Sequence, residues 1–112
     1  MQDWQSQFES MRASFLSRAG DRLDRIGVLL EKMYCAPTDK VILAEVRQHF
    51  HWLCGVGGTY KLPEVSELGW EGEELCDRLV DNGETPSITD VSRLQVLLVA
   101  VKEQFRAVGA VA

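Results

Sequence analysis

The feature that most constrains the fold is a sustained spacing of apolar residues by three or four positions through residues 3 to 34. The residues in this register are Trp4, Phe8, Met11, Phe15, Ala19, Leu23, Ile26, Leu30 and Met33. Such a spacing places them on one face of an α-helix and predicts helix throughout the segment. Gly20-Asp21 interrupts it, and Asp21 could cap a second helix. Because the apolar phase is unbroken across the interruption, one long helix and two shorter ones fit the pattern equally well.

Three further helices follow, each with recognisable start and stop signals. The second is expected from about Asp39 to Tyr60, with Thr38 as its N-cap and Asp39 at its positive end. Pro63 limits the preceding residue to extended backbone and suits the first turn of a third helix. Gly83 is a natural left-handed stop for that third helix.

The fourth helix is expected to start after Ser87, which forms a capping-box pattern with Asp90, and to fray from Ala107. The positions expected to be buried in the last two helices are Val65, Leu68, Gly72, Leu75, Leu79, Ile88, Val91, Leu98, Val101 and Phe105. Short connections make successive helices antiparallel neighbours. The sequence therefore predicts an all-α, antiparallel up-down four-helix bundle, a single domain over residues 1–112. An additional short helix at the N-terminus stays open.

Charge and composition narrow the classes of partner. A formal net charge of −5 and a pI near 5.0 argue against binding to nucleic acid and to anionic membranes. The longest apolar run, residues 96–101, is far shorter than the ~20 residues needed to span a bilayer. The polar, acidic start is not that of a signal peptide. The three cysteines lack metal-type spacing, and we interpret them as reduced thiols of a cytoplasmic protein.

His51 stands apart from the apolar stripe of the second helix. That stripe consists of Val46, Phe50, Leu53, Gly57 and Tyr60. His51 lies about 130° away on the helical wheel. Its side of the helix is shared by Arg47, Cys54, Gly55 and Gly58. Each helical glycine costs about 1 kcal/mol relative to alanine, so these glycines need a physical reason. Gly57 faces the core and would let a neighbouring helix approach, whereas Gly55 and Gly58 leave a bare surface where a macromolecule could reach the imidazole.

An exposed imidazole suits reversible phosphoryl transfer near neutral pH. The unperturbed imidazole pKa of about 6.5 leaves a large neutral fraction with a lone pair that can attack phosphorus. His49 lies about 160° from His51, at the edge of the apolar stripe, and is interpreted as a partly buried residue paired with Glu45. The two histidines therefore cannot share one zinc ion, and His51 with Cys54 gives only two of four ligands. With no carboxylate cluster for Mg²⁺ and no nucleotide-binding loop, no metal and no cofactor is expected.

The segments His51-Trp-Leu-Cys-Gly55 and Gly58-Thr-Tyr-Lys-Leu-Pro63 together resemble the signature of histidine-containing phosphotransfer (HPt) domains. The family pattern reads His-x-x-Lys-Gly, followed after a few residues by Gly, an aromatic residue, Gly and Leu. The resemblance implies that His51 accepts a phosphoryl group from a response-regulator receiver domain or a sensor histidine kinase and passes it to a receiver aspartate. The partner would supply that aspartate and the metal ion. The chain would then be a phosphocarrier in a phosphorelay, without turnover of its own.

Two positions depart from the family pattern. Cys54 stands where the family has lysine, and Lys61 stands where it often has glycine. A lysine one turn from His51 could steady a phosphoryl group, and Arg47 or Lys61 are the candidates to replace it. If neither does, the chain is a degenerate module that docks a receiver domain or a kinase without being phosphorylated. A dimerisation bundle unrelated to signalling is a third interpretation, and it leaves the outward-facing glycines unexplained.

Two tryptophans lie outside the apolar stripes of their helices, Trp52 on the second and Trp70 on the third. Exposed tryptophans are candidates for an interface. Packing against the N-terminal segment is an equally good expectation for both.

Overall fold

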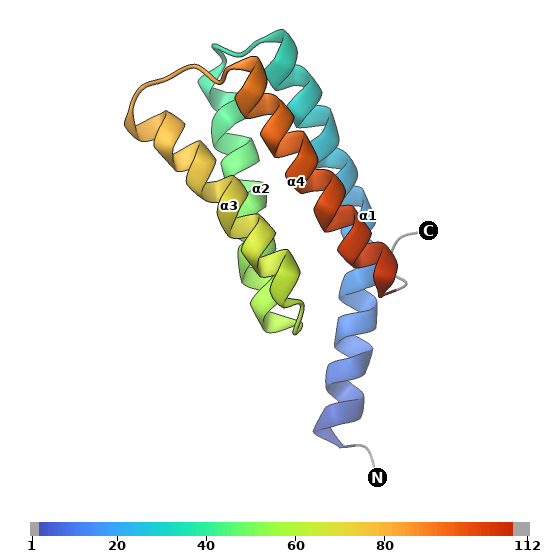
Figure 1. Cartoon of the computed structure of the whole chain (residues 1–112). Helices are drawn as coiled ribbons and strands as arrows, with labels where there is room; N and C mark the ends of the chain where they lie inside the picture. Colours follow the sequence, from blue (N-terminus) through green and yellow to red (C-terminus); the bar gives the residue numbers. More distant parts are fainter. Residues whose placement is uncertain (1–2, 109–112) are drawn as a thin grey trace.

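The computed structural model describes residues 3–108, which form four α-helices and no strand. The helices are α1 (Trp4–Cys35), α2 (Lys40–Thr59), α3 (Pro63–Asp81) and α4 (Ile88–Ala107). Successive helices run antiparallel, and α1 lies against α2 and α4 while α3 lies against α2 and α4 (Figure 1). The predicted all-α four-helix bundle is confirmed. Within the same residues no helix is long and apolar enough to cross a membrane.

A single helix, α1, covers the whole N-terminal segment over 32 residues. The alternative in which Asp21 caps a second helix is wrong, because Ala19 and Leu23 stay buried in one phase across the interruption. No separate short helix precedes α1 in the part of the chain that is described. The first turns of α1 project past the other helices (Figure 1). Trp4 and Met11 are therefore exposed, although they share the apolar spacing of the buried residues.

The helix ends mostly follow the sequence signals. Ser87 and Asp90 form the predicted capping box, and Gly83 has the expected left-handed conformation, with φ of 63°. The expectation that Thr38 caps α2 is wrong. Asp39 is the N-cap, because its backbone is extended and its carboxylate accepts hydrogen bonds from the amides of Val41 and Ile42.

The core draws on all four helices, with Phe50 of α2 and Phe105 of α4 as its largest fully buried side chains. Ile88 was expected inside but is 71% exposed, because it occupies the first turn of α4 at the end of the bundle. Leu68 and Leu75 were also expected to be buried, and they pack against the core only in part.

The closest helix pair is α2 with α3, and three glycines make the approach possible. A Cβ atom added to Gly57 would lie 2.7 Å from the Cα of Ser66, and one added to Gly69 would lie 2.9 Å from the backbone carbonyl carbon of Leu53. A Cβ atom on Gly72 would meet the ring of Phe50. The inward role predicted for Gly57 is confirmed, and α3 contributes the two other glycines of this contact.

Alanine substitutions should separate the packing glycines from the exposed ones. Gly57→Ala should lower the free energy of unfolding by about 1–3 kcal/mol, because its methyl group would collide with the α3 backbone. Gly55→Ala is the matched control on the same helix. It should raise the free energy of unfolding by about 0.5–1 kcal/mol, because nothing lies within 4 Å and alanine is the better helix former. Urea unfolding of both variants measures the difference, and equal stabilities would contradict the described packing.

Candidate functional site

His51 projects from the outer face of α2, and 70% of its side chain is exposed. Its helical neighbours Phe50 and Leu53 are fully buried and anchor that part of the helix in the core. The imidazole is therefore held on a rigid element while its ring remains open to a macromolecular partner.

Glu73 of α3 contacts this imidazole directly. Its Oε2 lies 2.7 Å from His51 Nδ1, and only 16% of the Glu73 side chain is exposed. An ionised carboxylate has no proton to donate, so Nδ1–H of the neutral imidazole is the donor. In the neutral ring this contact therefore favours the tautomer with the proton on Nδ1 and the lone pair on Nε2, the ring nitrogen not held by Glu73. The contact thus orients the ring and leaves the lone pair of Nε2 free of any partner among the described residues.

Arg47 is on the same side of α2 as His51, but carboxylates already hold its guanidinium. Its Nε donates to Asp77 Oδ1, and its Nη2 lies 4.0 Å from Glu73 Oε2. The hydrogen bond and the charge of Asp77 raise the pKa of Arg47 above its ordinary value. The four side chains form two cross-helix pairs, Arg47 with Asp77 and His51 with Glu73. One arginine and two carboxylates therefore lie around the imidazole, and these three groups together have a formal charge of −1.

Cys54 brings no charge to this site. Its Sγ lies 3.9 Å from Ser66 Oγ, and the Ser66 hydroxyl donates to the Cys54 carbonyl at 2.8 Å. The side chain is partly buried against α3.

Lys61 is not brought to His51. About 12 Å of helix separates His51 from Thr59, and Lys61 follows in the turn after it. Its Nζ lies 5.2 Å from the ring centroid of Phe8 in α1. Lys61 has a φ of 60°, the left-handed conformation that glycine adopts most easily. That backbone conformation gives a physical reason why the family pattern that this segment resembles often has glycine at the position of Lys61.

Gly55 and Gly58 are both exposed, and nothing would lie within 4 Å of a Cβ atom on either. They form a surface without side chains on the C-terminal side of His51, as their spacing indicates. Of the residues singled out from the sequence, Arg47, Cys54, Gly55 and Gly58 thus lie around His51.

His49 points to the opposite side of α2, toward α1. Its Nδ1 accepts a hydrogen bond from Arg22 Nε at 3.1 Å, and its Nε2 lies 3.9 Å from Glu45 Oε2. Burial, followed by the charge of Arg22, lowers the pKa of His49. The interpretation of His49 as a partly buried residue is supported, with Arg22 as a partner that the sequence did not indicate. Trp52 also packs toward α1, where the Arg22 guanidinium lies 4.2 Å from its ring centroid.

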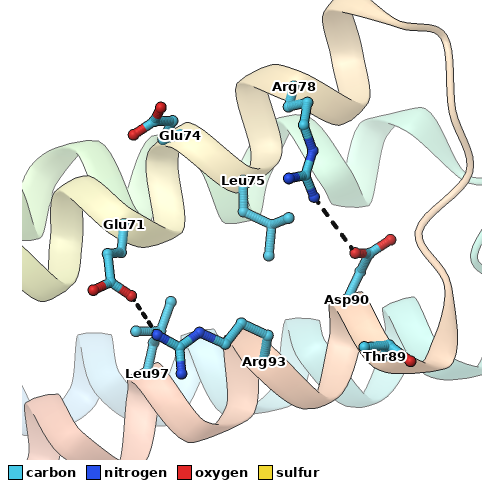
Figure 2. Close-up of a pocket in the computed structure, with 8 residues that line it drawn as sticks. All are labelled: Glu71, Glu74, Leu75, Arg78, Thr89, Asp90, Arg93 and Leu97. Atoms are coloured by element: carbon cyan, nitrogen blue, oxygen red, sulfur yellow. Dashed lines mark hydrogen bonds and ion pairs between the residues drawn. The ribbon is translucent and has the colours of Figure 1, made fainter.

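A cleft of about 520 Å³ lies between α3 and α4, away from His51 (Figure 2). Its apolar floor includes Leu75 and Leu97. Two ion pairs span it, Arg78 with Asp90 at 3.8 Å and Arg93 with Glu71 at 2.5 Å. These arginines are directed at their own carboxylate partners and do not converge on a common point (Figure 2). The cleft therefore shows no arrangement for catalysis.

Glu73 and Asp77 are the site residues that sequence reasoning missed. They lie four residues apart on α3, as Arg47 and His51 do on α2. That matching spacing was the available signal, but the register of the two helices was needed to interpret it. Among residues 3–108, no group of three or more His, Cys, Asp and Glu side chains could hold a metal ion.

The family model described as "Hpt domain" matches residues 10–108, which include all the site residues above. No curated protein and no solved structure shows significant similarity to the chain.

Proposed function

The chain belongs to the Hpt domain family, and from this membership and the geometry at His51 we propose that it carries a phosphoryl group on His51 Nε2 in a multistep phosphorelay. The observation that carries the proposal is the contact between His51 Nδ1 and Glu73 on an otherwise exposed ring. It leaves the lone pair of Nε2 accessible to a phosphoryl donor on another protein.

The transfer step needs no proton movement at His51. The Nε2 lone pair attacks the phosphorus of an aspartyl phosphate on a receiver domain, and a P–N bond forms. The bond between phosphorus and the aspartate oxygen breaks, and the aspartate leaves as a carboxylate with the electron pair. The phosphorylated ring keeps Nδ1–H and becomes cationic, so the Glu73 carboxylate stabilises the charge that develops on it. Attack by the carboxylate of another receiver aspartate reverses the step.

The partner supplies what the described site lacks. The receiver domain brings the aspartate and the Mg²⁺ that neutralises the phosphoryl oxygens, and this chain supplies the nucleophile and a docking surface. A sensor histidine kinase is the other candidate donor. Receiver domains and kinases of such relays act in the cytoplasm, where we place this chain as well. The chain is then a phosphocarrier and substrate, with no turnover of its own.

The charge at the site favours one alternative function. Cys54 is neutral, and the Arg47 guanidinium is engaged by Asp77. An arriving phosphoryl group therefore meets a formal charge of −1 without the cation that a lysine would supply. A degenerate module that docks a receiver domain or kinase without phosphorylation is the function this observation would support.

Substitution of each histidine tests the proposal. Incubation with receiver domains carrying radiolabelled aspartyl phosphate should label the wild type and the His49→Gln variant. The His51→Gln variant should stay unlabelled, because the glutamine amide has no comparable nucleophile. Labelling that survives in His51→Gln would show that another residue carries the phosphoryl group. If the wild type is unlabelled by every donor but still binds one of them, docking alone is the better account.

A further inference from the structure

Negative charge is concentrated in one helix, α3. It carries seven carboxylates and one arginine, a formal charge of −6, whereas the whole chain has a formal charge of −5. The rest of the chain is thus close to neutral. Any partner that meets α3 encounters a local field much stronger than the overall charge suggests.

The outer side of α3 forms an acidic ridge, which we define as Glu67, Trp70, Glu74 and Asp81. On a helical wheel the three carboxylates fall within about 60° of Trp70. All four residues are exposed, Trp70 to 55%, and the three carboxylates form no ion pair within residues 3–108. Figure 2 shows the Glu74 carboxylate directed away from α4, at the edge of the cleft that it helps to line.

Trp70 is the member of this ridge closest to the face that carries His51, and Glu67 and Glu74 lie on the far side of Trp70, toward α4. Gly69, the residue before Trp70, packs against the backbone of Leu53 and Cys54. Trp70 therefore stands level with the turn of α2 that follows His51, next to the bare surface of Gly55 and Gly58. Glu73, which contacts His51, lies about 60° from Trp70 on the same helix. A protein whose reactive group reaches His51 can therefore also contact Trp70, and the ridge carboxylates border that contact.

We propose that the acidic ridge selects the partner of this chain, a receiver domain whose surface beside its phospho-acceptor aspartate is basic and offers an apolar contact for Trp70. The proposal rests on the phosphorelay function above. Tryptophan is enriched among the residues that dominate binding energy at interfaces. The surrounding carboxylates favour a basic partner and repel an acidic one, which sets specificity and association rate more than affinity.

Charge also argues against a second copy of this chain as the partner that binds the acidic ridge. Two ridges brought together would each present the formal charge of −6 of α3. Like charges brought together at an interface are strongly unfavourable. The same negative charge on α3 disfavours the binding of nucleic acid, because its phosphates are also negative.

The test uses isolated receiver domains in two groups, one basic and one acidic on the surface bordering the aspartate. Binding is measured by titration calorimetry with the His51→Gln chain, which separates docking from chemistry. Basic receivers should bind, and the Kd should rise with ionic strength. Trp70→Ala should raise the Kd about tenfold. Its matched control is Trp4→Ala on α1, because Trp4 is more exposed than Trp70 but lies far from His51. That control should bind like the parent chain.

The charge is tested separately. The double variant Glu67→Lys with Glu74→Lys should lose affinity for basic receivers and gain it for acidic ones. Glu9→Lys with Glu31→Lys makes the same change of charge on exposed positions of α1, and it should leave the preference intact. Acidic receivers binding as well as basic ones, a Trp70→Ala variant that binds like the Trp4→Ala control, or no binding to any receiver would overturn the proposal.

A failure of the ridge proposal can be distinguished from a failure of the proposed phosphocarrier function. Phosphorylation of His51 at the wild-type rate in the Trp70→Ala variant and in the double charge variant would refute the role of the ridge and leave the carrier function intact. Binding that depends on the ridge, with no phosphorylation of His51 by any bound receiver, would refute the carrier function and leave the ridge intact.

Discussion

Replacing Glu73 by leucine is expected to slow phosphorylation of His51 by a phosphorylated receiver domain about thirtyfold. The carboxylate accepts from Nδ1–H at 2.7 Å and so selects the neutral tautomer whose lone pair is on Nε2. It also stabilises the cationic ring of the product. A hydrogen bond to a charged group contributes about 1.5–3 kcal/mol net. Because the His51 ring is 70% exposed, we expect a value near the lower end, about 2 kcal/mol, which corresponds to about thirtyfold in rate.

A tautomer measurement distinguishes positioning from a general loss of structure. Nitrogen NMR of the His51 ring should show the proton mainly on Nδ1 in the wild type and a shift toward Nε2 in Glu73→Leu. Glu73→Gln is the conservative control, since its amide oxygen can still accept from Nδ1–H, and it should recover much of the rate. The leucine variant keeps the pairing of Arg47 with Asp77, so no buried charge is left unpaired. An unchanged tautomer together with an unchanged rate would refute the role given to Glu73.

The Cys54→Lys variant should be phosphorylated about tenfold faster than the wild type. The site has two carboxylates and one arginine around His51, so an added ammonium would bring its formal charge from −1 to zero. A lysine can run its apolar stem along α3 and place its ammonium in solvent near Nε2. There it could form charge-assisted hydrogen bonds with the arriving phosphoryl oxygens. Tenfold corresponds to about 1.4 kcal/mol, a modest value because the surface is wet.

Cys54→Met is the matched control for this gain. It replaces the thiol by a longer, uncharged side chain and should leave the rate close to that of the wild type. Equal gains in the lysine and methionine variants would mean that packing against Ser66, and not charge, limits the reaction. If Cys54→Lys has no effect on a chain that is phosphorylated, the missing lysine does not limit the reaction.

The sequence was sufficient for the second, third and fourth helices and for the outward direction of His51, but it left open whether residues 3 to 34 form one helix or two. Apolar spacing fixes which side of α2 faces the core, so His51 was correctly placed outside and Gly57 inside. The capping box at Ser87 and the stop at Gly83 are local signals, and both were predicted for that reason. Thr38 and Asp39 are both good capping residues, and composition alone could not choose between them.

Features that depend on how the helices lie relative to one another could not be predicted from the sequence. The pairing of Glu73 with His51 requires the register of α3 against α2, which is set by the close contacts of Gly57, Gly69 and Gly72. Lys61 was considered as a cation for His51, but its direction follows from a left-handed turn and the ring of Phe8. The exposure of Trp4 and Met11 follows from how far α1 extends beyond its neighbours, and periodicity does not report that length.

The central claim, that His51 Nε2 carries the phosphoryl group, is tested most directly by NMR of the chain with nitrogen-15 in its two histidines. Spectra are recorded before and after incubation with a phosphorylated receiver domain. We predict coupling to phosphorus at Nε2 of His51, a proton retained on its Nδ1, and an unchanged His49 ring. Coupling at Nδ1 of His51, coupling at His49, or no nitrogen–phosphorus coupling with any donor that binds the chain would contradict the account.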